Sequence, residues 1–427
     1  MLRYPYRSAF AVLAVLPLAF SASLTPGWAG PGPDRLFEPI ATVDVEGEVA
    51  EILAATPDGR TVLYTDSAQE QVGFLDLAHP EQPRALGTAD VAGEPTSVAV
   101  TRDGRLALVA VDTSESFTDP SGTLEVLDVR TRQPIASLAL GGQPDSVAIS
   151  PDGQFAAVAI ENQRDEDVVV DGIEGGMPQA PAGYLSVVGL AGAPSSWVAK
   201  KVELTGLAGM LHPSDPEPEF VDIRDGIAAV TLQENNAVAL VDLAAREVVG
   251  SFSAGTVSRS DADTADDGEV AFDDALTAPR EPDAIQWTSD GNLVTADEGD
   301  LAETPSGGRG WTIFTPTGGI VYSSGGTAEK ALHQAGRYPD SRSDAKGAEF
   351  EGAEVARLRG QELIFIGSER GDAVLVYDAA DEAAPRLLQV LVTGDAPEGL
   401  LALTRQGLFL TSNEDDGTVS VFRIARG

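Results

Sequence analysis

The chain contains no cysteine, and it carries only 28 Lys and Arg residues against 67 Asp and Glu. The absence of cysteine excludes disulfide frameworks, cysteine-ligated zinc sites and thiol nucleophiles. The formal net charge of −39 excludes binding to nucleic-acid backbones or anionic membrane surfaces, because both need clustered Lys and Arg. We therefore expect the partners to be divalent cations, or ligands that are held through cations.

The first 29 residues have the features of a secretory signal peptide. Arg3 and Arg7 precede an apolar run at 9–20, and Gly27 and Ala29 supply the small residues of a cleavage site. The run is shorter than the ~20 apolar residues that a membrane span needs. The sequence thus predicts a signal peptide at 1–29, a linker at 30–39 and a single domain at 40–427. We expect a periplasmic or secreted monomer without a membrane span.

One pattern returns seven times along the chain. Each copy has a leading residue, usually acidic and often after proline, then a short alternating segment, a turn that often contains Asp-Gly, and an apolar run. The acidic leading residues are Glu51, Asp145, Glu219, Asp283, Glu351 and Glu398, and the second copy starts with the segment 94–98 (EPTSV). Copies of roughly 45 to 75 residues with about four short strands are typical of the blades of a β-propeller.

The strand pattern predicts an all-β fold, a single seven-bladed β-propeller. Residues 106–111 and 227–232 are apolar at nearly every position, which is typical of inner strands covered on both faces, whereas 123–129 alternates as an outer strand would. The last copy supplies only three strands, and the segment 40–45 precedes the first copy without a partner. We expect this N-terminal strand to complete the last blade and close the ring.

Several stretches resemble a known family. Residues 230–242 are similar to the YVTN-type repeat of bacterial propellers. Residues 280–299 (REPDAIQWTSDGNLVTADEG) and 341–355 (SRSDAKGAEFEGAEV) resemble the extracytoplasmic propellers called choice-of-anchor I domains, which overlap with phytase-like esterase propellers. The resemblance covers most of residues 40–424. It implies the propeller fold, and it implies an alkaline-phosphatase-like or phytase-like activity for some members.

Propeller topology predicts where the acidic residues gather. The tight turn after the first strand lies on one face of a blade, while the leading residue and the loop after the second strand open on the other. Six leading carboxylates should therefore ring the central channel as metal ligands: Glu51, Asp145, Glu219, Asp283, Glu351 and Glu398. A second ring should follow the second strands: Asp66, Asp112, Glu161, Glu234, Asp297, Glu298, Glu369, Glu414 and Asp415.

Carboxylates this close together repel one another unless a cation offsets their charge. Hard oxygen ligands in excess, with only three histidines and no cysteine, favour calcium or another divalent cation over zinc or copper. In an alternative interpretation, the leading residues have a structural role at the start of each repeat, and each carboxylate caps backbone amides of the next blade.

Two functions fit this pattern. In the first, an extracytoplasmic propeller binds calcium at its carboxylate rings and, through it, a small or surface ligand. In the second, the chain is a metal-dependent phosphoesterase in which Glu351 and Glu234 activate water, and Arg342 and Lys346 hold a phosphorylated or anionic small molecule. Salt bridges with neighbouring acids are the alternative role for these two cations. A ring-opening lactonase is a third hypothesis.

Overall fold

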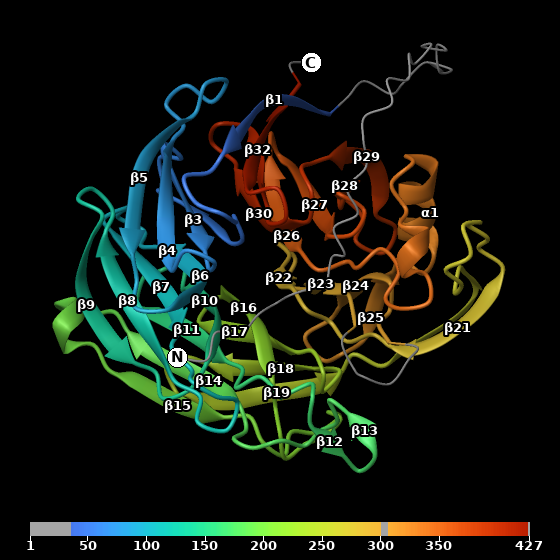
Figure 1. Ribbon diagram of the computed structural model, residues 1–427, viewed down its shortest axis with the longest axis horizontal. Helices are drawn as coiled ribbons and strands as arrows, with labels where there is room; N and C mark the ends of the chain where they lie inside the picture. Colours follow the sequence, from blue (N-terminus) through green and yellow to red (C-terminus); the bar gives the residue numbers. More distant parts are fainter. Residues whose placement is uncertain (1–35, 300–305, 426–427) are drawn as a thin grey trace, which may run out of the picture.

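The structure, a computed structural model, describes residues 36–299 and 306–425. Seven four-stranded antiparallel sheets stand around a common centre (Figure 1). This arrangement confirms the all-β, seven-bladed propeller. The predicted signal peptide at 1–29 lies outside the described residues. Within the described ranges, no helix is long and apolar enough to cross a membrane.

Six of the seven blades are meanders, in which the four strands of the blade pair in the order in which they follow in the chain. Blades one to three consist of β2 (Leu53–Ala55), β3 (Thr61–Asp66), β4 (Gln71–Asp76) and β5 (Arg84–Asp90); β6 (Glu94–Val100), β7 (Leu106–Asp112), β8 (Gly122–Asp128) and β9 (Gln133–Ala139); and β10 (Pro144–Ile149), β11 (Phe155–Ile160), β14 (Tyr184–Gly189) and β15 (Ala199–Glu203). A 3-10 turn, Pro194–Ser196, precedes β15.

The remaining blades follow the same plan. Blades four to six consist of β16 (Pro218–Arg224), β17 (Ile227–Leu232), β18 (Ala237–Asp242) and β19 (Glu247–Ser253); β22 (Ile285–Trp287), β23 (Leu293–Asp297), β24 (Gly310–Phe314) and β25 (Ile320–Ser323); and β26 (Ala353–Leu358), β27 (Gln361–Ser368), β28 (Ala373–Asp378) and β29 (Arg386–Val392). Blade seven takes β30 (Pro397–Leu403), β31 (Leu408–Asn413) and β32 (Thr418–Ile424) with β1 (Phe37–Asp44) as its fourth strand.

Three insertions depart from the repeat. The hairpin β12 (Val169–Val170)–β13 (Ile173–Glu174) lies between the second and third strands of blade three. The hairpin β20 (Thr256–Ala262)–β21 (Asp274–Pro279) precedes blade five, and α1 (Thr327–Gln334) with the 3-10 turn Asp340–Arg342 precedes blade six. In a propeller blade, the loop between the second and third strands and the connection from one blade to the next both open on the face where the first strands begin. We call this the leading face. The insertions therefore all rise from the leading face.

The core lies between the blades rather than inside one layer. Seven hydrophobic clusters of the described residues each join two adjacent blades. Strand β7 shows how: Leu108 and Ala110 pack toward blade three, whereas Val109 and Val111 pack toward blade one. Because successive side chains of a strand point to opposite faces, an inner strand must be apolar at every position.

The expectation that residues 123–129 form an outer strand is wrong. They belong to β8, the third strand of blade two, in which Leu124 and Val126 pack toward blade three and Leu127 packs toward blade one. The outer strand is β9, which is mostly exposed. Its position at the rim leaves it without blades on both sides, so polar residues are tolerated there.

The N-terminal strand closes the ring as predicted. Strand β1 pairs antiparallel with β32, from Phe37 opposite Ile424 to Asp44 opposite Thr418. Figure 1 shows β1, in blue, beside β32, in red. Phe37 is fully buried, and the side-chain amide of Gln389 in blade six both accepts from its backbone N–H and donates to its carbonyl, at 2.9 Å each.

The Asp-Gly turns stabilise the opposite face of the ring. In blade one the carboxylate of Asp58 accepts hydrogen bonds from the Thr56 hydroxyl at 2.7 Å and from the Arg60 backbone N–H at 3.1 Å. Arg405 of blade seven donates to the Pro57 carbonyl at 3.2 Å and so links the turns of adjacent blades. These carboxylates have structural partners, which separates them from the carboxylates of the leading face.

Candidate functional site

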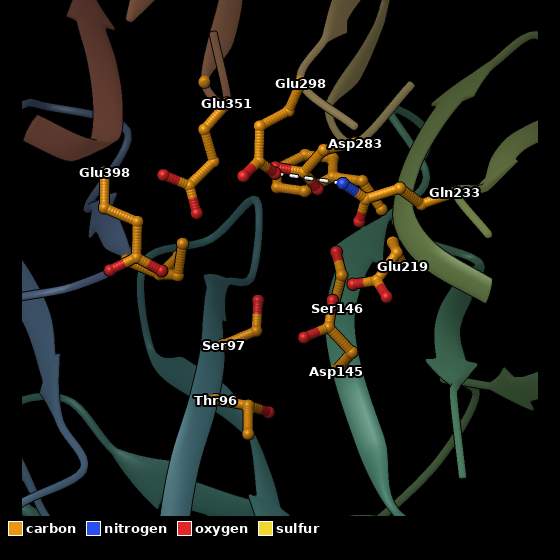
Figure 2. A pocket seen from close by; sticks show the side chains of 13 residues that line it. Thr96, Ser97, Asp145, Ser146, Glu219, Gln233, Asp283, Glu298, Glu351 and Glu398 are labelled. Carbon is orange, nitrogen blue, oxygen red and sulfur yellow. Dashed lines mark hydrogen bonds between the residues drawn. The ribbon is translucent and has the colours of Figure 1, made fainter. Parts of the chain in front are cut away.

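A cavity of about 130 Å³ lies at the centre of the propeller, and carboxylates dominate its lining (Figure 2). Five of the six predicted metal ligands line it: Asp145, Glu219, Asp283, Glu351 and Glu398. They come from five consecutive blades, three through seven. The sixth, Glu51, accepts hydrogen bonds from the hydroxyls of Ser67 and Thr65, the latter at 3.4 Å.

Blade two breaks the carboxylate ring. Its leading residue is Thr96, whose hydroxyl donates to the carbonyl of Pro144 in blade three at 3.2 Å. The neighbouring Ser97 hydroxyl accepts from the Val147 backbone N–H at 3.2 Å. These bonds join the inner strands of two blades directly, so this side of the cavity needs no cation.

Two groups of three carboxylates open on the cavity, and we call them the inner trios. Inner trio one is Asp145, Glu161 and Glu219, and inner trio two is Asp283, Glu298 and Glu351. In each trio, one oxygen atom from each carboxylate lies within 4.8 Å of the others. Each trio combines the leading carboxylates of two adjacent blades with a carboxylate that directly follows the second strand of the earlier blade.

Two further groups, the outer trios, lie beside the inner ones. Outer trio one is Glu161, Glu217 and Glu234, and outer trio two is Glu298, Glu349 and Glu369. All six of these residues are buried, with at most 8 % of each exposed. Glu161 and Glu298 therefore belong to an inner and an outer trio at once.

Outer trio one is held by Arg164, which comes from the insertion in blade three. One guanidinium nitrogen, Nη1, lies 2.7 Å from Glu234 and 3.2 Å from Glu217. The guanidinium Nε donates to the Gly175 carbonyl at 3.1 Å, and the residue is only 3 % exposed. The insertion thus delivers a buried positive charge to the carboxylates of blade four.

Outer trio two is held by residues from the segment before blade six and from blade six itself. Arg342 approaches Glu349 at 2.5 Å, and Arg370 contacts Glu349 at 3.4 Å and Glu369 at 2.8 Å. The ammonium of Lys346 lies 2.6 Å from Glu298. The two predicted anion-binding residues, Arg342 and Lys346, are therefore both ion-paired with buried carboxylates.

Inner trio one has no such partner. Within the described part of the chain, no hydrogen bond or ion pair reaches the carboxylates of Asp145, Glu161 or Glu219, although Glu161 is only 7 % exposed. In inner trio two, Glu298 accepts from the Gln233 amide at 2.9 Å as well as from Lys346, while Oε2 of Glu351 is buried without a hydrogen-bond partner among the described residues.

Burial and mutual repulsion raise the pKa of these acids. Burial raises the pKa of Asp145 to about 7 and that of Glu51, next to Glu414 and Asp66, also to about 7. Burial, with the negative charges of neighbouring carboxylates, holds the pKa values of further groups well above their usual range: Glu161, Glu219, Asp283, Glu351 and Glu398. A bound cation would remove this penalty.

The two predicted catalytic carboxylates lie in different groups. Glu351 belongs to inner trio two, whereas Glu234 belongs to outer trio one and contacts Arg164. Blade four presents Gln233 to the cavity instead (Figure 2). Glu234 lies outside the cavity lining, in the second ring of carboxylates expected for it, and its catalytic role stays a prediction.

Glu217, Glu349 and Arg164 were not among the site residues expected from the sequence. A signal existed for the two acids, because Glu217 and Glu349 each stand two positions before a leading carboxylate, Glu219 and Glu351. Arg164 lies in an insertion outside the repeat, so no periodic pattern marks it.

Fold and site together define a β-propeller with buried acidic clusters on its leading face. A family model for the choice-of-anchor I domain matches residues 51–306 and 303–382. The chain belongs to the choice-of-anchor I domain family, as the resemblance of 280–299 and 341–355 predicted. No curated protein matches the chain significantly.

A solved structure supports the fold. The chain is similar to hydrazine synthase from Kuenenia stuttgartiensis, with a TM-score of 0.56 and 16% sequence identity over 90% of this chain and 97% of the other. At this level of identity the similarity establishes a shared propeller architecture and nothing about chemistry.

Proposed function

We propose that this protein is an extracytoplasmic propeller that binds a divalent cation, calcium, at the carboxylates of its central cavity, and through it a small or surface ligand. Inner trio one carries the proposal. Asp145, Glu161 and Glu219 converge within 4.8 Å without a donor or a counter-ion from the described residues. Buried carboxylates in that state are stabilised by a cation or by protonation.

The donor set suits calcium. Three carboxylates offer up to six oxygen atoms, and Ca²⁺ accepts six to eight oxygen ligands in a flexible geometry. Mg²⁺ demands near-ideal octahedral geometry and is usually bound through one or two carboxylates with several waters, so a set of three carboxylates favours Ca²⁺. Asp145 and Glu219 line the cavity, so a bound ion would keep a side open to a ligand.

Membership of the family supports the proposed location outside the cytoplasm. Choice-of-anchor domains are typically found on secreted or cell-surface proteins. Extracellular modules commonly bind calcium with dissociation constants of about 10⁻⁴ to 10⁻³ M, which matches the calcium available there. The predicted signal peptide at 1–29 agrees with this location.

Thermal unfolding tests the proposal. Calcium should raise the melting temperature relative to a chelator, because the trio exists only in the folded state; at one hundred times the dissociation constant, linkage gives ~2.7 kcal/mol. Magnesium at the same concentration is the ionic-strength control and should give a smaller shift. The Asp145→Asn/Glu219→Gln double variant should lose the calcium shift. Identical melting curves in chelator and in millimolar calcium would refute the proposal.

A metal-dependent phosphoesterase is the second candidate. Lys346 favours it, because its ammonium lies 2.6 Å from Glu298 in inner trio two, where a cation could share a phosphoryl oxygen with a bound metal. In this candidate Glu351 would activate water, and Arg342 and Lys346 would hold the anion. Hydrolysis of p-nitrophenyl phosphate and phytate, with and without calcium, tests it. Turnover that survives Arg342→Ala with Lys346→Ala would exclude this site.

A further inference from the structure

The two inner trios are copies of one arrangement. Inner trio one joins blades three and four, and inner trio two joins blades five and six. Their central carboxylates, Glu161 and Glu298, each directly follow the second strand of the earlier blade, β11 and β23. Four carboxylates repeat in the same positions: Asp145, Glu161, Glu217 and Glu219 in the first copy, and Asp283, Glu298, Glu349 and Glu351 in the second. The fifth differs, because Glu369 directly follows β27 whereas Glu234 is the second residue after β17.

The outer trios show what such a group binds in this molecule. Each outer trio has the same spread of carboxylate oxygens as an inner trio, and each is contacted by guanidinium groups of the protein, Arg164 in one copy and Arg342 with Arg370 in the other. A trio of this geometry thus holds a positive charge twice within the same chain. No guanidinium among the described residues forms an ion pair with the cavity-facing carboxylates of the inner trios, Asp145, Glu219, Asp283 and Glu351.

Glu161 adds an independent observation for inner trio one. Only 7 % of Glu161 is exposed, and its carboxylate points into the trio. The described residues provide no hydrogen-bond or ion-pair partner for this carboxylate. In inner trio two, Oε2 of Glu351 is likewise buried without a hydrogen-bond partner among the described residues.

Blade four separates the two copies. In blade four the residue directly after the second strand is Gln233, a neutral side chain that donates to Glu298 at 2.9 Å. Figure 2 shows Gln233 between Glu219 of one trio and Asp283 of the other. The amide interrupts the carboxylates at this point, so the cavity has two separate acidic groups rather than one continuous ring.

We propose that the cavity holds two separate divalent cations, one in each inner trio, and that the ion in inner trio one binds more tightly. The inference rests on the proposed function and adds the number, the ligands and the order of the sites. The order follows from Lys346, whose ammonium contacts Glu298 and repels a cation in inner trio two. Arg164 also places a positive charge near Glu161, but it forms its ion pairs with Glu217 and Glu234 of outer trio one, whereas Lys346 pairs directly with Glu298, a member of inner trio two.

A calcium titration of the full chain, by calorimetry and by metal analysis after dialysis, tests the proposal. Wild type should bind two ions in two classes of affinity. Glu161→Gln should remove the tight class and Glu298→Gln the weak class, so that each variant binds one ion. Glu414→Gln is the matched control, because Glu414 directly follows β31 of blade seven and belongs to none of the trios found among the described residues. It should still bind two ions.

Lys346→Gln gives a test that does not remove a ligand. The weak class should become tighter by at least ~5-fold, the effect of removing one nearby charge at a partly solvated site, while the tight class stays unchanged. Binding of no calcium by folded wild type would refute the proposed function itself. Binding of one ion, equal loss in Glu161→Gln and Glu298→Gln, or an unchanged weak class in Lys346→Gln would refute the two-site inference and leave the proposed function standing.

Discussion

Glu161 and Glu298 hold the same position in blades three and five, and each carboxylate is shared between an outer trio that guanidinium groups contact and an inner trio that opens on the cavity. The guanidinium groups offset part of the negative charge of the outer trios. An insertion supplies Arg164, and the segment before blade six supplies Arg342. The departures from the repeat therefore supply cations to the outer trios, and within the described residues they leave Asp145, Glu219, Asp283 and Glu351 without a guanidinium partner.

Replacement of Arg164 by methionine should destabilise the protein. Glu217 and Glu234 would lose their counter-charge while buried, which typically costs about 3–5 kcal/mol. Urea unfolding in a chelator measures the loss. Calcium should restore part of it in Arg164→Met, because outer trio one then becomes free to bind a divalent ion. Unchanged stability in the chelator would show that Arg164 does not compensate these acids.

Stability in a chelator should fall as the pH rises. Burial raises the folded-state pKa of Asp145 and Glu51 to about 7, and that of Glu354 and Glu369 to about 8, all above the unfolded values. The folded state then binds protons more tightly than the unfolded state, so this stabilisation is complete below about pH 4 and is lost as the pH rises through 7 to 8. Melting temperatures in EDTA should be lower at pH 8.5 than at pH 5.5, and calcium should reduce the difference. A melting temperature that rises with pH in EDTA would contradict the raised pKa values.

Removal of residues 36–45 should open the ring. The deletion exposes the edge of β32 and the pocket of Phe37, which packs edge-on against Phe365 and Phe409. We expect a broad, less cooperative unfolding transition and concentration-dependent association through the free edge. Light scattering and calorimetry measure both. A truncated chain that stays monomeric and equally stable would show that β1 is dispensable for closure.

Asp58→Ala should separate structural acids from ligand-binding ones. Asp58 caps the first turn of blade one on the face opposite the leading residues, where its carboxylate accepts bonds from Thr56 and Arg60. The substitution should cost roughly 1 kcal/mol of stability, as for the loss of similar side-chain caps, and should leave calcium binding unchanged. A weakened calcium affinity in Asp58→Ala would mean that the effect of an acid on binding does not depend on its place in the fold.

The fold was predictable from the sequence because the repeat fixes the number of blades and the unpaired strand at 40–45 fixes the closure. The error at 123–129 has a physical cause. Thr123 and Glu125 give β8 an alternating pattern, yet Glu125 is only 7 % exposed, because the third strand of a blade is still covered by its neighbours. Alternation in a propeller therefore does not identify the rim.

The face of the propeller on which the carboxylates gather was predictable from the sequence. The grouping of these carboxylates into trios was not. Topology placed Asp145, Glu219 and Glu351 on one cavity, but the grouping depends on which side chains meet across blades. In the turn after β17, Gln233 lines the cavity and Glu234 lies beside Arg164, a division that depends on the insertion in blade three. Arg164 could not be found, since an insertion carries no repeat register.

A crystal structure of the protein grown in calcium, with anomalous data from a terbium or manganese soak, tests the central claim most directly. The account predicts one peak among the carboxylates of Asp145, Glu161 and Glu219, and a second, weaker peak among those of Asp283, Glu298 and Glu351. Oxygen ligands should lie at about 2.3–2.6 Å from calcium. A cavity without metal density, in which the carboxylates instead share protons in short hydrogen bonds with one another, would contradict it.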